Sequence, residues 1–290
     1  DHDPDLLVAN AGGPDLLLRN DGGGQYVDVT PPPLQVPVHT YSAAWGDFTG
    51  DGLFEGFRLF LFAAGEFPSS GQPIARLALA GHEELCPVLE RLFLEREAEG
   101  DTWRHQKYID TMHGNLFESR FDLFRWPDPP VRALTAWVHG KVASLVQDLN
   151  GYDNATMDTL RFDYHAWFHI TRRLGYQGQH NHPNASWSGI FCVHPGDSLP
   201  DRPDSGLVRF HDPRTHVDMY SDAGNRDLRL PFSTGTCDWK HRRGQLVLFP
   251  SYLRHEIYPY LGERPRIVVA FNCWINRIGQ QPHAVPQPRG

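Results

Sequence analysis

The chain has 290 residues, with 27 Lys or Arg against 35 Asp or Glu, so its formal net charge at pH 7 is −8. This length can bury a substantial core in one large domain or two modest ones. The acidic balance argues against nucleic acid or an anionic membrane as a partner. No apolar run approaches the ~20 residues of a membrane-spanning helix, and the start does not have the pattern of a signal peptide, so we expect a cytoplasmic protein. Neither a zinc knuckle nor a dense disulfide framework is predicted, because the four cysteines form no CxxC pair.

Residues 1–57 are rich in Gly, Asp and Asn, with short apolar runs separated by turn signals such as "AGGP" and "NDGGG". This composition is typical of β-hairpins. The stretch "DHDPDLLVANAGGPDLLLRNDGGGQYVDVT", followed by "SAAWGDFTGDG", resembles about one and a half FG-GAP/VCBS repeats, the blade units of β-propellers. A single blade cannot bury its own faces. We therefore interpret residues 1–57 as a repeat remnant attached to the rest of the chain.

The same segment contains a candidate calcium loop. In "AAWGDFTGDGLFE", Asp47, Thr49, Asp51 and Glu55 are spaced around Gly52, which is similar to a loop of the DxDxDG kind. Thr49 replaces a carboxylate and weakens the pattern. Ca2+ is thus a candidate ligand, and a calcium-dependent binding module is one functional hypothesis. That hypothesis needs several blades, whereas the chain offers at most one and a half.

Residues 58–162 have mainly helical character. In "ARLALAGHEELCPVLERLFLEREAEG" the apolar residues recur at a spacing of three to four, which predicts a helix. The stretch "PPVRALTAWVHGKVASLVQDLNGY" repeats this pattern between a Pro pair and an Asn-Gly pair. The aromatic stretch between them is irregular, and we expect it to line a pocket. Whether these packing helices also form a homodimer is left open by the sequence.

Residues 163–278 show β patterning. Runs rich in β-branched and aromatic residues alternate with Gly, Pro and Asp turns: "YHAWFHITRRL", "WSGIFCVHPG", "SGLVRFHDPR", "QLVLFPSYLRHEIYPYL" and "PRIVVAFNCWI". Short strands at regular spacing predict a sandwich or jelly roll. The predicted fold class is therefore α+β, with a jelly-roll core, packing helices and a short β-rich N-terminal segment. Residues 279–290 are too poor in apolar side chains to order themselves and are predicted to be a flexible tail.

Two separated motifs carry candidate metal ligands. "HNHP" provides His180 and His182, and some 75 residues later "FPSYLRHEIYPYLGERPRIVVAFN" provides His255 and Arg266. Two neighbouring ligands and one distant ligand suit a mononuclear iron site in a jelly roll, with open positions for a 2-oxo acid and oxygen. Arginine is the natural partner for the far carboxylate of that acid, because its planar group makes a bidentate contact and is always charged.

Residues 58–278 resemble bacterial 2-oxoglutarate/Fe(II)-dependent oxygenases. Three ordered motifs carry the resemblance: "HNHPNASWSGIFCV", "RFHDPR" and "GQLVLFPSYLRHEIYPYLGERPRIVVAFN". It implies a double-stranded β-helix that binds Fe(II) and 2-oxoglutarate and releases succinate and CO2 while hydroxylating a small molecule or a peptide side chain. It also implies that His255 is the distal iron ligand and that Arg266 forms a salt bridge with 2-oxoglutarate.

The proximal pair departs from the usual family pattern. Most such oxygenases have His-x-Asp or His-x-Glu, whereas this chain has His180-Asn181-His182. Either His182 takes the position of the carboxylate, or Asp212 of "FHDPR" supplies the anionic ligand. We favour three histidines, because two residues separated by one position at a strand end can point to the same side. Asp212 would then pair with Arg214 to close a turn.

Several other residues are candidates for supporting roles. Ser188 is a candidate hydrogen-bond donor to 2-oxoglutarate, and Arg264 competes with Arg266, although strand alternation favours Arg266. Four histidines flank the predicted site and are candidates for contacts with the ligands or for proton handling: His165, His169, His194 and His211. Asn272 and Trp274 follow Arg266 and are expected to pack or to reach the pocket. A second enzyme hypothesis is a three-histidine, cupin-like dioxygenase that does not use 2-oxoglutarate, although Arg266 would then have no evident purpose.

Overall fold

The computed structural model describes residues 73–106, 109–213, 220, 222–226 and 235–279, together with the backbone of seven short strands nearer the N-terminus. The chain divides into two compact units, residues 1–73 with 214–235 and residues 74–213 with 236–290. The predicted domain boundary at residues 57/58 remains a prediction. The predicted tail lies outside the described residues from position 280 onward.

The first unit contains only short antiparallel pairings among its described strands. A three-stranded sheet has the order β1-β3-β4, and two further pairs are β2 with β5 and β6 with β7. Their bounds are Leu6–Val8 (β1), Ala11–Gly13 (β2), Leu16–Asn20 (β3), Tyr26–Asp28 (β4), Val38–His39 (β5), Ala44–Gly46 (β6) and Glu55–Phe57 (β7). Of the candidate calcium-loop residues, Asp47, Thr49 and Asp51 lie outside the described residues, and Glu55 is the first residue of β7.

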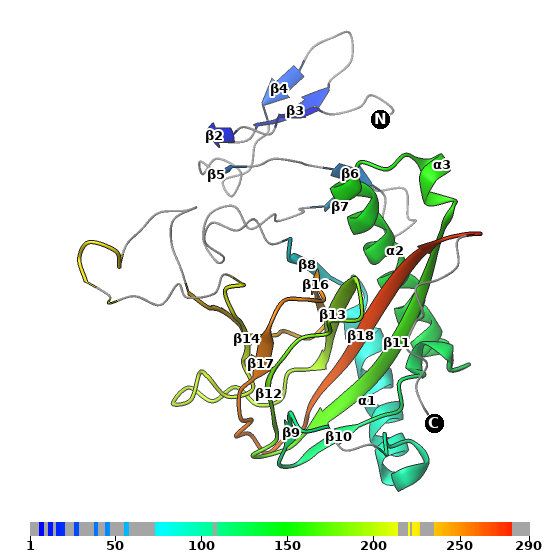
Figure 1. Ribbon diagram of the computed structural model, residues 1–290, viewed down its shortest axis with the longest axis vertical. Helices are drawn as coiled ribbons and strands as arrows, with labels where there is room; N and C mark the ends of the chain where they lie inside the picture. Colours follow the sequence, from blue (N-terminus) through cyan, green and yellow to red (C-terminus); the bar gives the residue numbers. More distant parts are fainter. Residues whose placement is uncertain are drawn as a thin grey trace. The chain divides into compact units, whose positions relative to one another are not determined.

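The second unit is built on two antiparallel sheets (Figure 1). The six-stranded sheet has the order β10-β11-β18-β13-β16-β8, and the five-stranded sheet has the order β15-β14-β17-β12-β9. Their bounds are Ala75–Ala78 (β8), Met112–His113 (β9), Leu116–Glu118 (β10), Leu160–Thr171 (β11), Tyr176–His180 (β12), Trp187–His194 (β13), Val208–Phe210 (β14), Cys237–Trp239 (β15), Gln245–Pro250 (β16), His255–Ile257 (β17) and Arg266–Arg277 (β18). This arrangement confirms the predicted α+β class with a double-stranded β-helix core.

Two long helices, α1 (His82–Ala98) and α2 (Pro129–Asn150), pack against the outer face of the six-stranded sheet, and the short α3 (Asn154–Met157) follows α2 in the chain. Phe93 of α1 stacks on Phe168 of β11 with ring centroids 4.3 Å apart, and Trp137 of α2 meets Phe191 of β13 at 5.9 Å. Large aromatic contacts of this kind bury much apolar area and fix the helices against the sheet. None of the described helices is long and apolar enough to cross a membrane.

The long strands β11 and β18 contribute side chains to both faces of the six-stranded sheet, one packed against the helices and the other lining the cavities. They pair along their full length and lie side by side in Figure 1. Since side chains alternate across a strand, Phe168 points to the helices, whereas Trp167 and His169 point to the opposite face, where both line cavities. The inner face of this sheet packs against the five-stranded sheet, as Phe249 of β16 shows by its ring contact with Phe210 of β14 at 5.0 Å.

The predicted helix over the stretch that begins "ARLALAG" was wrong at its start. Residues Ala75–Ala78 form the edge strand β8, paired with β16, and the helix begins only at His82. Gly81 separates the two with φ 72°, a left-handed conformation that favours glycine. The short apolar run was ambiguous because a buried strand and a helical turn share the same composition.

Candidate metal centre

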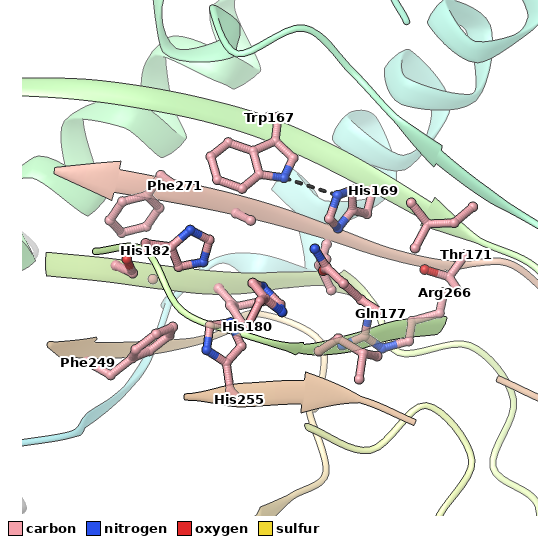
Figure 2. Close-up of a pocket in the computed structure, with 17 residues that line it drawn as sticks. Trp167, His169, Thr171, Gln177, His180, His182, Phe249, His255, Arg266 and Phe271 are labelled. Carbon is pink, nitrogen blue, oxygen red and sulfur yellow. Dashed lines mark hydrogen bonds between the residues drawn. The ribbon is translucent and has the colours of Figure 1, made fainter. Parts of the chain in front are cut away.

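Three histidines converge between the two sheets. His180 is the last residue of β12, His182 follows it, and His255 is the first residue of β17. Each offers one ring nitrogen, and the three nitrogens lie within 4.8 Å of one another. Figure 2 shows the three rings turned toward a common space. The structure thus brings together the three histidines that the sequence motifs selected, and three nitrogen ligands on one side are suited to a divalent transition metal.

A β-bulge helps to aim β12 into this space. The register between β12 and β17 shifts between the pairs Gln177 with Ile257 and His180 with His255. In a regular strand, residues three apart point to opposite faces, but Gln177 and His180 both line the same cavities. The extra residue therefore turns both side chains inward, as bulges near binding sites often do.

Backbone carbonyl groups fix the orientation of two imidazoles. Nδ1 of His180 lies 2.8 Å from the carbonyl oxygen of Gly178, and Nδ1 of His255 lies 3.0 Å from that of Leu253. A carbonyl oxygen only accepts hydrogen bonds, so each Nδ1 carries the proton and each Nε2 keeps its lone pair. These are the nitrogens that remain available to a metal ion.

Burial keeps the three imidazoles neutral. It lowers the pKa of His182 to about 3, with the neighbouring His180 contributing further. Burial likewise lowers the pKa of His180, and it places the pKa of His255 well below the usual value, with His180 and His182 adding to the effect. A protonated imidazole has no lone pair on either nitrogen, so neutrality at physiological pH is a condition for metal binding.

Asp212 does not join this cluster. It follows β14 and is partly buried, but the described groups whose ligand atoms meet within 4.8 Å are the three histidines alone. Its predicted partner Arg214 lies outside the described residues. The geometry therefore supports His182, and not Asp212, as the third ligand.

Arg266 lies on the same inner face at the start of β18. It is 2% exposed, and it pairs across the sheet with Thr171. Its Nη2 lies 3.3 Å from Nδ1 of His241, and among the described residues no carboxylate forms an ion pair with it. Burial lowers its pKa. Arg264, by contrast, forms a surface ion pair with Glu90 at 3.0 Å.

Two cavities meet at His180 and His182, and His255 lines the narrower of them. The narrower one is also lined by Arg266, Thr171 and Ser188 (Figure 2). The wider one has a volume of about 300 Å3 and is also lined by Glu118 and Asn272. His180 and His182 line both cavities, so a metal ion held there would contact both spaces.

A buried acid near the site was missed by sequence reasoning. Glu118 of β10 is 3% exposed, and its Oε2 lies 2.7 Å from Nε2 of His169. Its Oε1 lies 3.3 Å from Nδ1 of His105. Burial alone would raise the pKa of Glu118, but the contacts with His105 and His169 outweigh it and lower the pKa. The carboxylate is therefore ionised beside the wider cavity.

The other sequence candidates have varied positions. Ser188 lines the narrower cavity, with its hydroxyl donating to Oδ1 of Asn272 at 2.7 Å. His165 lines the wider cavity against Trp274, at 4.7 Å between ring centroids. Two candidates line neither of these cavities. The backbone N–H of Gly196 donates to Nδ1 of His194, and Nε2 of His211 lies 3.1 Å from Glu256.

Comparison with known families agrees with this site. Residues 165–272 match the model of a family described as "Putative 2OG-Fe(II) oxygenase", and residues 1–55 match the model of an FG-GAP-like repeat. Both resemblances inferred from the sequence are thus confirmed. No curated protein matches the sequence.

Among solved structures, the chain is similar to a Pseudomonas putida prolyl-4-hydroxylase, with 16% identity, coverage of 69% of this chain and 92% of that chain, and a TM-score of 0.47. It is also similar to AviO1 from Streptomyces viridochromogenes Tue57, with 14% identity, coverage of 74% and 92%, and a TM-score of 0.44. HygX from Streptomyces hygroscopicus, with nickel, 2-oxoglutarate and hygromycin B bound, has 14% identity, coverage of 70% and 83%, and a TM-score of 0.43.

Proposed function

We propose that the chain is a 2OG-Fe(II) oxygenase, which the match of residues 165–272 to that family's model supports, and that it hydroxylates a small molecule or a peptide side chain. His180, His182 and His255 would hold Fe(II), and Arg266 would hold 2-oxoglutarate. The bound pair would supply the oxidation of an unactivated C–H bond by O2, while 2-oxoglutarate leaves as succinate and CO2. The residues of this chain position and isolate these reactants.

The donor set fits the metal. Imidazole nitrogens are suitable ligands for iron, and three of them lie close enough together to share one ion. All three are neutral, so they leave the two positive charges of Fe(II) uncompensated. A 2-oxoglutarate dianion would neutralise both charges. In a site with a carboxylate ligand, that ligand would already neutralise one of them.

The observation that carries the proposal is the buried Arg266. A buried guanidinium without a carboxylate partner is unfavourable by several kcal/mol, and within the described part of the chain no such partner is found. Arg266 lines the narrower cavity together with the three histidines. An anion that enters this cavity would pair with the guanidinium of Arg266. A dicarboxylate could place one carboxylate on Arg266 and the other on the metal ion.

The wider cavity suits the compound that is oxidised. Its volume of about 300 Å3 lies at the lower end of the range of small-molecule sites, roughly 300–1,000 Å3. Trp167 and Phe121 contribute aromatic surface, whereas Glu118, Asn181 and Asn272 contribute polar groups. This lining favours a small, partly polar molecule or a single side chain of a peptide.

The two alternative hypotheses are not favoured. A cupin-like dioxygenase that binds its substrate directly to iron would have no use for Arg266 in its buried position. A calcium-dependent binding module would rest on residues 1–55, which match an FG-GAP-like repeat, and the candidate calcium ligands there gain no support.

Binding of 2-oxoglutarate tests the assignment of Arg266. We expect Arg266→Met to weaken binding to the nickel-loaded protein by about 2–5 kcal/mol, roughly 30-fold to several-thousand-fold in Kd, because a buried anion would lose its charged partner. Isothermal titration calorimetry under nitrogen measures this. The matched control is Arg264→Met, which removes a surface cation near the start of the same strand and should leave Kd unchanged. Equal affinities of Arg266→Met and the wild type would refute the assignment.

A further inference from the structure

Asn272 is a fourth polar group in contact with the three-histidine site. It lies in β18 opposite Ser188 of β13, and its side chain lines the wider cavity. Its Nδ2 lies 3.3 Å from Nδ1 of His182, and its Oδ1 accepts a hydrogen bond from the Ser188 hydroxyl at 2.7 Å. Asn272 therefore connects one candidate metal ligand to a buried serine.

His182 differs from the other two ligands in what fixes its proton. The carbonyl oxygens of Gly178 and Leu253 can only accept, so His180 and His255 are held with the proton on Nδ1. Nδ1 of His182 instead faces a side-chain amide, and an amide both donates and accepts. The position of the proton on His182 thus depends on which end of Asn272 faces it.

Only one of the two amide orientations allows His182 to bind a metal. If the NH2 group donates to Nδ1, the proton of the neutral ring must be on Nε2, and neither nitrogen is free for a metal. If the amide oxygen faces Nδ1, the ring donates from Nδ1 and Nε2 keeps its lone pair. The two orientations have the same shape, so packing does not distinguish between them.

The serines behind Asn272 can support either orientation. Ser188 and Ser251 are 1% and 0% exposed, and their hydroxyl oxygens lie 2.8 Å apart, a distance at which either can donate. When Ser251 donates to Ser188 and Ser188 donates to Asn272, the NH2 group faces His182. In the reverse direction, His182 donates to the amide oxygen, the NH2 group donates to Ser188, and Ser188 donates to Ser251. Each arrangement keeps the contacts of Asn272 with His182 and Ser188, and of Ser188 with Ser251, as hydrogen bonds.

We propose that Asn272 is the positioning residue of the third metal ligand. Metal binding selects the second direction, in which His182 donates to the side-chain oxygen of Asn272, Asn272 donates to Ser188, and Ser188 donates to Ser251. This inference rests on the proposed function, because it assumes that the three histidines bind a metal. It explains how a histidine without a backbone carbonyl partner can serve as a ligand in place of a carboxylate.

Two variants separate an accepting role from a filling role. Asn272→Leu keeps the approximate size but cannot accept, and we expect it to weaken Co(II) binding by about 10- to 100-fold, as is usual when the partner of a metal-bound histidine is lost. Asn272→Asp can only accept, so it should bind Co(II) at least as tightly as the wild type. Asn276→Leu changes another asparagine of β18 and should have no effect.

Competition with a chromophoric chelator gives Kd without any turnover, and the visible spectrum of bound Co(II) reports its ligands. Wild-type affinity in Asn272→Leu would overturn the inference, and so would a loss in Asn272→Asp of tenfold or more. If Asn272→Leu does not fold, the Co(II) affinity of Asn272→Asp relative to the wild type decides alone: equal or tighter binding supports the inference, and a loss of tenfold or more overturns it. Failure of the wild type to bind Co(II) would instead contradict the proposed function.

Discussion

At the scale of single residues, the main feature is a candidate metal site formed by three histidines. His180, His182 and His255 are neutral, because burial lowers the pKa of each. Fe(II) bound to them keeps both positive charges until a dianion arrives. We therefore expect metal and 2-oxoglutarate to strengthen each other's binding, since each lowers the electrostatic cost of the other and such coupling is reciprocal.

The third ligand is decided by comparing two single substitutions. We expect His182→Ala to lose bound Fe(II), as His255→Ala should, because two imidazoles hold the ion much less tightly than three. Asp212→Ala should retain one Fe(II) per chain, because Asp212 is not among the groups that meet at the site. Metal content after anaerobic loading and gel filtration measures this. Loss of iron from Asp212→Ala with retention in His182→Ala would assign the ligand to Asp212 instead.

At the scale of elements, the site depends on how closely the strands behind it pack. Gly189 of β13 lies opposite Phe271 of β18. A Cβ atom added at Gly189 would lie 2.3 Å from Cζ of Phe271 and 2.8 Å from Cδ2 of Leu248. The absence of a side chain at this position leaves room for the Phe271 ring against β13.

Substitution of this glycine should therefore destabilise the fold. We expect Gly189→Ala to lower the free energy of unfolding by about 1–3 kcal/mol, the usual cost of overpacking a core. Gly140→Ala is the matched control, because Gly140 lies in α2 and an added Cβ meets nothing within 4 Å. There the better helix propensity of alanine should raise stability by about 1 kcal/mol. Urea titrations measure both, and equal stability of the two variants would contradict the packing argument.

The sequence allowed the strands that carry the site to be predicted, because their signals are local. The stretch "HAWFHIT" alternates with period two, a β-branched run follows Arg266, and His180 and His182 are separated by only one residue in the motif. The contact between Glu118 and His169 could not be found in this way. These residues are 51 positions apart, and they meet only because β10 pairs with β11. A signal was present in His165, Trp167, His169 and Thr171, which share one face of a strand yet are not uniformly apolar.

The partner of His182 was also beyond sequence reasoning. Asn272 is visible in the motif, but its contact depends on the register between β18 and β13 and on the loop that carries His182. The edge strand β8 was missed because its four residues gain their strand character from pairing with β16. Propensity alone does not record such tertiary pairings.

At the scale of the whole molecule, two sheets enclose one line of polar groups. The narrower cavity is lined by Arg266 and the three histidines, and the wider cavity is lined by Glu118, His180 and His182. The co-substrate and the compound to be oxidised would thus approach the metal from different spaces. Buried histidines are part of this arrangement, and they make the stability of the fold sensitive to acid.

His241 provides a test of that sensitivity. It is 5% exposed, and burial, followed by the charge of Arg266, holds its pKa well below the usual value. Below pH 6.5 the unfolded chain binds a proton at His241 that the folded protein does not, so stability rises with pH and is lost as the pH falls. His241→Gln keeps an acceptor for Arg266 and removes this effect. As the pH falls from 6 to 5, both proteins lose stability. We expect the unfolding free energy of the wild type to fall by about 1.4 kcal/mol more than that of His241→Gln. Parallel curves for the two proteins would show that His241 titrates freely in the fold.

The most direct test of the central claim is the stoichiometry of the co-substrate reaction. Purified protein loaded anaerobically with Fe(II) is mixed with 2-oxoglutarate and oxygen, and succinate and oxygen consumption are measured together. We predict that each O2 consumed yields one succinate, even in the slow reaction without a second substrate. We also predict that both signals disappear in His255→Ala and fall strongly in Arg266→Met. Oxygen consumption without succinate, or succinate release that persists in His255→Ala, would contradict the account.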